Sequence, residues 1–498
     1  MARGQFDGAF AATFDLFTLP ELFMIRQLAF LFALSCSSIF WAGQTVGAAQ
    51  PNILFIFADD HAYSAVHALG NDEIETPNLD GLARRGVTFS HAYNQGSWSG
   101  AVCVASRTML VTGQFLWKAE KTYRNTDKEF RQQNRLWPQL LEKAGYETYF
   151  SGKWHIRADA TKAFNVARHV RPGMPNQTPA GYNRPKNKDD KNWKPWDKSF
   201  EGFWKGGVHW SEVLKNDAVD YLHQAAKNDK PFFMYLAFNA PHDPRQSPRR
   251  FVEKYPLEKI SLPRSFVPEY PYEIGSNRIR DEQLAPFPRT PYAVKVNRQE
   301  YYAIITHMDH QIGQILKTLK ETGQADNTYI VFTADHGLAV GHHGLMGKQN
   351  MFDHSVRVPF MIVGPDVPTG RTIDTPIYLQ DVVPTTLELA KAKKPEHVDF
   401  HSVLPIIRGD SSGEYESMYG GYLAVQRMVT HDGGKLVLYP KIKRALLFDM
   451  RADPDELNDL ASDETRPRMR QLFKRLQALQ KETGDRLDLA AAFPELAG

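Results

Sequence analysis

The hydrophobic pattern of the chain contains three continuous apolar runs, each as long as a typical buried strand. They are NILFIFA at 52–58, PFFMYLAF at 231–238 and YIVFTA at 329–334. Runs that are apolar on both faces are typical of parallel sheets covered by helices on both sides. Each run is followed directly by polar residues, at 59–60, 239–243 and 335–336. Because ligands bind at the carboxyl ends of strands in such sheets, we expect these polar segments to converge on one site.

Helical patterns separate the apolar runs. We expect helices over 78–85, 106–114, 136–145, 213–226 and 297–322. The last is the clearest: Asn297 and Glu300 predict a capping box at its start, and Gly323 predicts its end. Strands that alternate with helices predict a wound α/β sheet.

The pattern changes after about residue 405. Short segments there predict antiparallel strands, at 427–430, 435–439 and 445–449, and a terminal helix is expected over 467–483. This part is predicted to form a smaller α+β domain. Residues 166–200 show no clear periodicity, and we expect a long surface loop.

The N-terminus has the pattern of a secretory signal peptide. Residues 28–41 are the apolar part of the longest uncharged stretch, Arg26 precedes it, and small residues follow at 46–49. We therefore expect a leader over 1–49, with Met24 as an alternative start, and a periplasmic or secreted protein. The apolar core is short for a bilayer span, so no integral membrane association is expected. A buried N-terminal helix is the disfavoured alternative.

Composition and charge exclude several classes of protein. The 498 residues include 60 Lys+Arg and 57 Asp+Glu, a net charge of +3, and 42% are hydrophobic. These values are ordinary for a globular protein and exclude global disorder. The balanced charge argues against a nucleic-acid partner, because nucleic-acid-binding domains usually carry a basic excess.

Two cysteines are present, Cys36 and Cys103. Removal of the leader would take Cys36 with it, so Cys103 could form no disulfide within the chain. A lone cysteine in an exported protein is either a buried apolar filler or a residue with a chemical role. Cys103 just precedes the predicted helix 106–114, whose N-terminus favours anions, and Arg107 adds a cation. A thiol in that setting could itself be a nucleophile.

Four polar residues at two of the strand ends suit a metal ion. Asp59 and Asp60 follow the first run, and Asp335 and His336 follow the third. Oxygen-rich sets of this kind bind Ca²⁺ or Mg²⁺. Zinc is disfavoured, because the chain has no HExxH motif and no set of several cysteines. Solvated turn residues are the alternative interpretation.

A series of motifs then identifies a family. Cys103, Ala105, Ser106 and Arg107 match a Cys-x-Pro/Ala-Ser-x pattern with its arginine, and Thr112-Gly113 extends it. Further segments follow in order, namely PNILFIFADD (51–60), TPNLDGLARRGVTF (76–89), GKWH (152–155), APHDP (240–244), TADHG (333–337), GLMGK (344–348) and SVRVPF (355–360). From about 51 to 460 the chain resembles the formylglycine-dependent sulfatases of the alkaline-phosphatase superfamily, most of all bacterial carbohydrate sulfatases.

The resemblance implies a fold and a division of the chain. The fold would be an alkaline-phosphatase-like α/β sandwich, with a large, mixed, mostly parallel sheet flanked by helices. A smaller C-terminal α+β subdomain would carry a short antiparallel sheet. The catalytic domain would span 50–405 and the subdomain 406–498.

The resemblance also implies a mechanism. A formylglycine-generating enzyme, or an anaerobic sulfatase-maturating enzyme, would convert Cys103 to formylglycine, an aldehyde that hydrates to a gem-diol. One diol oxygen would attack sulfur and displace the substrate alcohol, and the second hydroxyl would then expel sulfate. The metal ligands would be Asp59, Asp60, Asp335, His336 and the modified residue 103, with Ca²⁺ favoured over Mg²⁺.

The remaining site residues follow from the matching motif positions. Arg107, Lys153 and Lys348 would neutralise the sulfate oxygens, and His155 would assist at the diol. His242 would protonate the leaving alcohol, with Lys348 as a rival. The chain departs from many relatives at His336, where they carry Asn, and at Ala105, where they carry Pro.

Substrate contacts are expected from residues near these motifs, namely His61, Trp98, His209 and Arg245. The substrate would be a sulfated saccharide. Two alternatives are a phosphate or phosphonate ester hydrolase of the same superfamily and an inactive glycan-binding relative. Cysteine rather than Ser or Thr at position 103 favours sulfate, and every expected catalytic position is filled, which argues against an inactive protein.

Overall fold

The computed structural model describes residues 50–498, apart from 177, 179–184, 186 and 276–278. The predicted leader over 1–49, with Cys36 and the alternative start at Met24, lies outside the described residues. In the part of the chain that is described, no helix has both the length and the apolar character needed to cross a bilayer.

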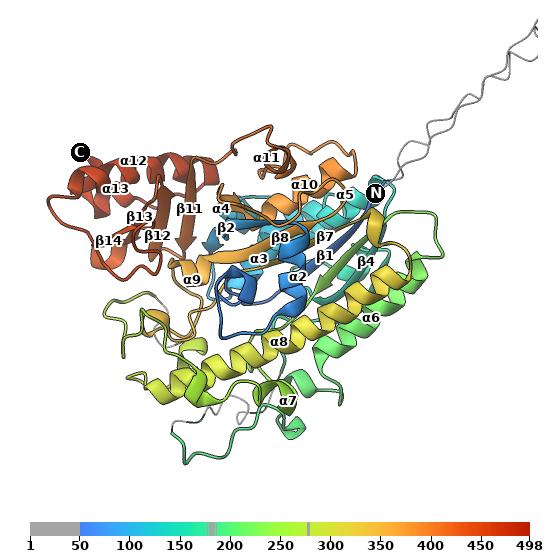
Figure 1. The fold of residues 1–498 in the computed structure, drawn as a ribbon. Helices are drawn as coiled ribbons and strands as arrows, with labels where there is room; N and C mark the ends of the chain where they lie inside the picture. Colours follow the sequence, from blue (N-terminus) through green and yellow to red (C-terminus); the bar gives the residue numbers. More distant parts are fainter. Residues whose placement is uncertain (1–49, 177, 179–184, 186, 276–278) are drawn as a thin grey trace, which may run out of the picture. The chain divides into compact units, whose positions relative to one another are not determined.

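A nine-stranded mixed sheet forms the centre of the protein, in the order β10-β2-β8-β7-β1-β6-β4-β5 with β9 beside β2 (Figure 1). The strands are β1 (Asn52–Ala58), β2 (Val87–Tyr93), β4 (Glu147–Lys153), β5 (Val166–Arg171), β6 (Phe232–Ala237), β7 (Thr328–Ala334), β8 (Arg357–Val363), β9 (Arg371–Ile373) and β10 (Ile377–Tyr378). Only β8 runs antiparallel to its neighbours, β2 and β7. The three apolar runs are confirmed as β1, β6 and β7, which are adjacent and parallel.

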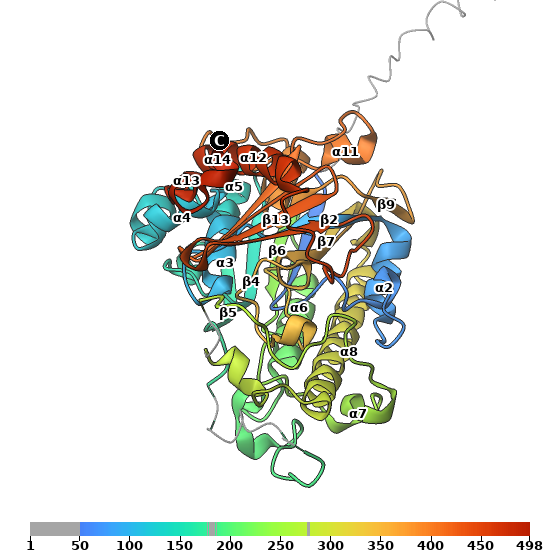
Figure 2. The ribbon, with the colours of Figure 1, turned by 90° about the vertical axis from the view of Figure 1, so that its left-hand side faces the viewer.

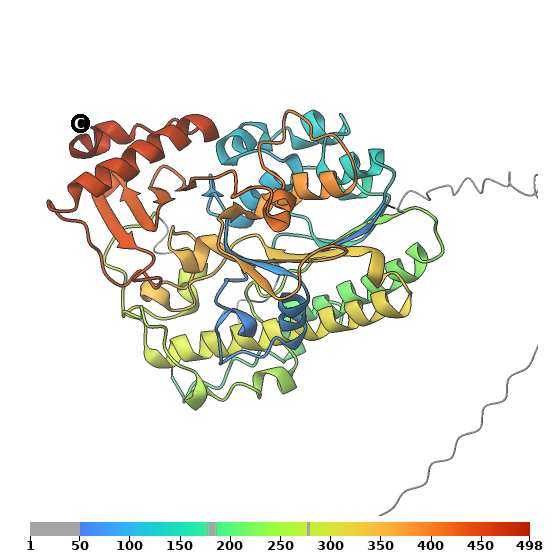
Figure 3. The same ribbon diagram turned by 45° about the horizontal axis from the view of Figure 1, so that its top comes forward.

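Helices cover both faces of this sheet (Figures 1 and 3). On one face lie α2 (Pro77–Arg85), α6 (Trp210–Ala225) and α8 (Pro291–Glu321), and the short α7 (Arg249–Val252) packs against α8. On the other lie α3 (Val102–Thr112), α4 (Leu116–Tyr123), α5 (Trp137–Lys143) and α10 (Val382–Leu389). Two further short helices are α9 (Asp353–Val356) and α11 (Leu404–Arg408). The predicted fold class is confirmed.

The core between the sheet and α5 is aromatic. The Phe55 ring lies 5.0 Å from that of Trp137 and 4.9 Å from that of Tyr235, both edge-on. All three side chains are fully buried, and the Trp137 indole donates a 2.8 Å hydrogen bond to Thr386 Oγ1. Edge-to-face pairs of this kind add about 0.5–1.5 kcal/mol each beyond the burial of their surface. The strand β1 that carries Phe55 is therefore held firmly, and so are the residues at its end.

A second sheet of five strands lies toward the C-terminus, in the order β14-β13-β12-β11-β3. Its strands are β3 (Gly96–Ser97), β11 (Ser417–Tyr422), β12 (Gln426–His431), β13 (Gly434–Tyr439) and β14 (Arg444–Asp449). The helix α12 (Arg466–Thr483) packs on it, followed by α13 (Leu489–Ala492) and α14 (Pro494–Ala497) (Figure 2). The three predicted antiparallel strands and the terminal helix are confirmed. The boundary at 405/406 stays a prediction, and β3, from before it, pairs in parallel with β11.

Three local predictions are wrong. The helix α8 begins at Pro291 and not at Asn297, because Thr290 caps it by accepting a hydrogen bond from the Ala293 amide and Pro291 suits the first turn. Asn297 lies inside the helix, so it forms no capping box. The helix α3 begins at Val102, before Cys103, and not at residue 106. Residues 166–171 are a sheet strand, and Trp193 is buried, so the segment 166–200 is not all surface loop.

Candidate active site

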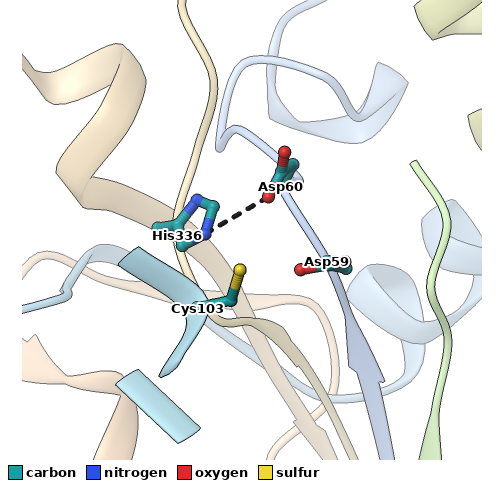
Figure 4. A group of neighbouring side chains, drawn as sticks. All are labelled: Asp59, Asp60, Cys103 and His336. Atoms are coloured by element: carbon teal, nitrogen blue, oxygen red, sulfur yellow. Dashed lines mark ion pairs between the residues drawn. The ribbon is translucent and has the colours of Figure 1, made fainter. Parts of the chain in front are cut away.

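The polar ends of β1 and β7 meet at one edge of the large sheet, as the sequence predicts. Asp59 and Asp60 follow β1, His336 lies just beyond β7, and all three are fully buried. Figure 4 shows their side chains pointing toward one another and toward Cys103. One ligand atom from each of these four residues lies within 4.8 Å of all the others.

Cys103 is the second residue of α3, so its side chain lies in the first turn of the helix. It is a free, buried cysteine. Burial raises the pKa of its thiol, but the ammonium groups of Lys153 and Lys348 and hydrogen bonds with His155 and His242 outweigh this and hold the pKa well below the ordinary value. An anionic group is therefore favoured at this position.

Two cations hold the carboxylate groups beneath Cys103. Arg107 donates from Nε to Asp335 Oδ2 at 3.0 Å and from Nη1 to the Lys153 carbonyl at 2.9 Å. Its Nη2 lies 3.6 Å from Asp59 Oδ1, and Lys153 Nζ lies 2.5 Å from Asp59 Oδ2. Arg107 and Lys153 are fully buried, so they act on the site from within the protein.

A third cation and a histidine lie on the Asp60 side. Lys348 donates from Nζ to both carboxylate oxygens of Asp60, at 2.9 and 2.7 Å. His242 Nδ1 lies 3.0 Å from Asp243 Oδ1, and His242 Nε2 lies 3.9 Å from Asp60 Oδ2. Burial lowers the pKa of His242, but the negative charges of Asp243 and Asp60 outweigh this effect and raise the pKa to about 10. An imidazolium is thus favoured there in the metal-free protein.

The donors around Cys103 fit a divalent cation. Asp59 Oδ1 and His336 Nε2 are buried and accept or donate no hydrogen bond, and their nearest charged neighbours are Arg107 Nη2 at 3.6 Å and Asp60 Oδ1 at 3.2 Å (Figure 4). Asp335 Oδ1 accepts hydrogen bonds from the amides of Asp60 (3.1 Å) and His336 (3.0 Å), so it also fixes the backbone of two donors. Carboxylate oxygens with one imidazole, buried and partly unpartnered, are a suitable set for a hard cation.

A cavity of about 430 Å³ opens above this group. It is lined by Cys103, His155, His242, Lys348 and Arg280, among others. Asp281, Asn176, Met174 and Gln349 also line it. Arg280 Nη2 lies 2.5 Å from Asp281 Oδ1 and 3.4 Å from Asp243 Oδ1, which fixes this wall against the His242–Asp243 pair.

The four predicted substrate residues do not line this cavity. His61 bonds to the Ala65 carbonyl at 2.9 Å, and His209 accepts from the Ser211 amide at the start of α6. Arg245 donates to Asn297 Oδ1 at 2.7 Å, and these three side chains are buried. Trp98 is half-buried, two residues before the cavity-lining Gly100. Substrate contact by these four residues stays a prediction.

The sequence patterns did not predict the wall formed by Arg280 and Asp281, and Asp243 is not among the predicted site residues. Asp243 had a signal, because it follows His242 in the motif APHDP. Arg280 and Asp281 lie in a segment without a motif or periodicity. Only the tertiary structure brings them beside Lys348, whose Nζ lies 3.8 Å from Asp281 Oδ2.

Comparison with known proteins gives consistent matches. The sulfatase family profile matches residues 51–392, and a profile for the C-terminal part of N-sulphoglucosamine sulphohydrolase matches 341–482. A choline-sulfatase of Rhizobium meliloti is 30% identical over 84% of each chain. An N-acetylglucosamine-6-O-sulfatase of Bacteroides thetaiotaomicron is 24% identical over 93% of this chain and 91% of its own.

Solved structures share the fold. One, determined in complex with its substrate D-glucosamine-2-N,6-O-disulfate, has a TM-score of 0.71 at 22% identity and covers 88% of this chain and 98% of its own. The phosphonate monoester hydrolase of Agrobacterium radiobacter has a TM-score of 0.69 at 20% identity and covers 87% of this chain and 96% of its own.

Proposed function

The chain belongs to the sulfatase family and is a sulfuric ester hydrolase, and from this premise we propose that it removes O-sulfate groups from a sulfated carbohydrate. The nucleophile would be a formylglycine made from Cys103, and the cation Ca²⁺. One observation carries the proposal: Cys103 lines the cavity, and its Sγ lies within 4.8 Å of the donor atoms of Asp59, Asp60 and His336.

The cation would be held by Asp59, Asp60, Asp335, His336 and the modified residue 103. When bound, it would supply positive charge that lowers the pKa of the nucleophilic hydroxyl and offsets the charge of the sulfate oxygens. The fit of the donor set, with Asp59 Oδ1 and His336 Nε2 left without hydrogen bonds, supports this assignment.

The cations of the site have different tasks in this proposal. Lys348 lines the cavity, so its ammonium group would donate to a sulfate oxygen directly. Lys153 and Arg107 do not line it; they would hold Asp59 and Asp335 in place and stabilise negative charge at residue 103 from beneath. This division is supported by the full burial of both side chains.

Two histidines would move the protons. Burial lowers the pKa of His155, so its imidazole is neutral near pH 7 and suited to accept a proton at residue 103. His242 is held on its Nδ1 side by Asp243, which leaves Nε2 to donate a proton to the leaving alcohol. Lys348 stays the rival donor.

Export and maturation complete the proposal. A leader over 1–49 would direct the chain to the periplasm or the outside, and a formylglycine-generating or anaerobic maturating enzyme would modify Cys103. Sulfated saccharides are the proposed substrates, and two relatives support this: one is named for N-acetylglucosamine 6-O-sulfate hydrolysis, and another was solved with a disulfated glucosamine.

Two measurements on protein from a native host test the proposal. Mass spectrometry of the peptide that contains residue 103 should show the mass of formylglycine. A panel of sulfated mono- and oligosaccharides should include members from which the protein releases sulfate. An unmodified thiol throughout, together with full sulfatase activity in Cys103→Ala, would contradict it.

A second candidate is hydrolysis of phosphate or phosphonate esters. The fold shared with a phosphonate monoester hydrolase at a TM-score of 0.69 favours it. Steady-state rates on matched aryl sulfate and aryl phosphate esters separate the two functions. A large preference for phosphate would replace the sulfate proposal.

A further inference from the structure

An aromatic pair and an arginine lie together near the active-site cavity, outside the residues that act on the sulfate in the proposed mechanism. The Trp98 and Tyr123 rings are 5.7 Å apart at 52°, and Arg157 Cζ lies 5.1 Å from the centre of the Tyr123 ring. Trp98 and Tyr123 are half-buried and Arg157 is exposed. We call these three residues the rim cluster.

Chain connectivity places the rim cluster close to the cavity. Trp98 precedes Gly100 by two residues, and Arg157 follows His155 by two; both Gly100 and His155 line the cavity. Two residues span at most about 7 Å, so the backbones of Trp98 and Arg157 lie within that distance of residues that line the cavity. Gly100 itself is open, because a Cβ there would meet nothing nearer than the Tyr422 hydroxyl at 3.9 Å.

The polar atoms of the rim cluster are not used within the described part of the protein. Six other tryptophans donate hydrogen bonds from the indole nitrogen, namely residues 117, 137, 154, 193, 204 and 210, but Trp98 does not. Among the described residues, the Tyr123 hydroxyl has no hydrogen-bond partner and Arg157 has no ion pair. Arg280, at another part of the cavity wall, is instead held by Asp281 and Asp243.

This chemistry matches a sugar ring with an anionic substituent. Aromatic faces pack on the apolar C–H face of a pyranose, and indole and phenol groups add hydrogen bonds at the edge. A guanidinium group binds sulfate or carboxylate oxygens in a two-point geometry. Because the sulfate to be cleaved must sit beside Cys103, a ring on the rim cluster would belong to the neighbouring sugar.

We propose that Trp98, Tyr123 and Arg157 form a second saccharide subsite, which stacks the sugar next to the one being desulfated and pairs Arg157 with an anionic group on it. The proposal rests on the proposed sulfatase function toward carbohydrates. The anionic group is either a sulfate ester or a uronate carboxylate, and the test separates these sources.

The test compares single sugars with disaccharides. Formylglycine-bearing wild type, Trp98→Ala and Arg157→Ala are assayed on a sulfated monosaccharide and on disaccharides whose second ring carries a sulfate, a carboxylate or no charge. Arg157→Ala removes an ionic hydrogen bond and Trp98→Ala removes a stacking surface, so each should lower kcat/KM on the charged disaccharides about tenfold. Both should leave kcat/KM on the monosaccharide within about twofold. On the uncharged disaccharide only Trp98→Ala should lower it.

The charged disaccharide whose kcat/KM falls further in Arg157→Ala identifies the anionic group. Arg157→Lys should restore part of the loss, because it keeps the charge but not the planar fork. Arg168→Ala is the matched control, since Arg168 stacks on Tyr221 at 5.3 Å without lining the cavity, and it should change nothing. Equal losses on monosaccharide and disaccharide, or no loss on either, would overturn the proposal.

Binding distinguishes failure of the subsite from failure of the proposed function. If wild type releases sulfate from no saccharide of the panel, the carbohydrate-sulfatase function fails. The subsite is then judged by calorimetric titration of the same disaccharides into Cys103→Ala. A tenfold weaker affinity in Cys103→Ala/Arg157→Ala supports it, and an equal affinity or absence of binding rejects it.

Discussion

Two clusters of buried charge in this protein differ in what their charges do. The first surrounds Cys103 at the edge of the large sheet. In the second, Lys435 Nζ on β13 lies 2.7 Å from Asp353 Oδ1 and 2.6 Å from Glu456 Oε1. All three residues of this second cluster are buried. The cluster contains no cysteine, because Cys103 lies with Asp59 and Asp60 in the first.

The second cluster ties elements together. Lys435 lies on β13 of the small sheet, Asp353 begins α9, and Glu456 follows β14. The Glu456 carboxylate also accepts a 2.7 Å hydrogen bond from the Asp353 amide. Among the described residues, the groups of donor atoms close enough to share a metal ion lie around Asp60, and none includes Asp353 or Glu456.

The two clusters show that buried charge alone does not identify a catalytic centre. Both clusters join lysine to carboxylates, and both adjoin a cavity. Among the described residues, only the first contains a cysteine together with side chains whose donor atoms lie close enough to share a metal ion. Donor atoms that are spaced for a shared ligand are the distinguishing feature, and four experiments test this difference.

The largest effect is expected from Cys103→Ala. Removal of the proposed nucleophile should lower kcat for sulfate ester hydrolysis at least about 10⁴-fold. Thermal unfolding should change little, because the side chain is small and its loss leaves the paired charges intact. Initial rates and differential scanning calorimetry measure the two effects. Activity above a tenth of wild type would show that the first cluster does not act through Cys103.

Lys435→Met should lower the stability of the protein and leave its activity unchanged, the opposite of Cys103→Ala. It leaves Glu456 buried without its cation and leaves Asp353 with only Arg357, 3.8 Å away, which should cost about 3–5 kcal/mol of unfolding free energy. Denaturant titration measures this loss, and the folded fraction should keep the wild-type kcat. The double variant Lys435→Met/Glu456→Gln should regain part of the stability. A loss of kcat with unchanged stability would remove the contrast between the clusters.

A bound cation should stabilise the folded protein only when the first cluster is intact. Ca²⁺ at about one hundred times its dissociation constant should add about 2.7 kcal/mol to the stability of the EDTA-treated wild type. Asp59→Asn should abolish this gain, whereas Asp353→Asn should keep it. The shift in melting temperature between EDTA and Ca²⁺ is the measurement. An equal shift in Asp59→Asn and wild type would exclude the assigned site.

The smallest effect concerns pH and the second cluster. Burial and the charge of Asp353 raise the pKa of Glu456 to about 7 from the ordinary 4.5. A raised folded-state pKa gives stability that is present below pH 4.5 and lost as pH rises through 7. In the wild type, this group should lower the free energy of unfolding by about 2 kcal/mol between pH 5 and 7, and Glu456→Gln should remove that fall. Parallel curves for variant and wild type would contradict this.

Much of the fold was predictable because it depends on local patterns. The strands β1, β6 and β7 are continuous apolar runs, and their parallel pairing brings Asp59, Asp60 and His336 together. The approach of Cys103 to these residues was expected only from family resemblance. No local pattern in the sequence fixes how α3 packs against the ends of β1 and β7.

The rest depends on contacts between distant segments. The strand β11 contains Gly420-Gly421, which weakens any strand signal, and the two-residue β3 has none. The start of α8 was placed too late because Asn297 and Glu300 have capping-box spacing, whereas their buried side chains face the protein interior. Arg280 and Asp281 reach the cavity through a segment without periodicity, so no pattern could assign them to the site.

The pairing of β3 with β11 has a consequence for the timing of synthesis. Gly96 pairs with Gly421, so the segment that leads into Cys103 finds its partner only after 421 − 96 = 325 further residues have been made. At roughly 5–20 residues per second, that interval is about 16–65 seconds. Folding then buries the thiol. A maturating enzyme would therefore have to act within this interval, or on a chain kept unfolded during export, and a variant that folds faster should carry less modified residue.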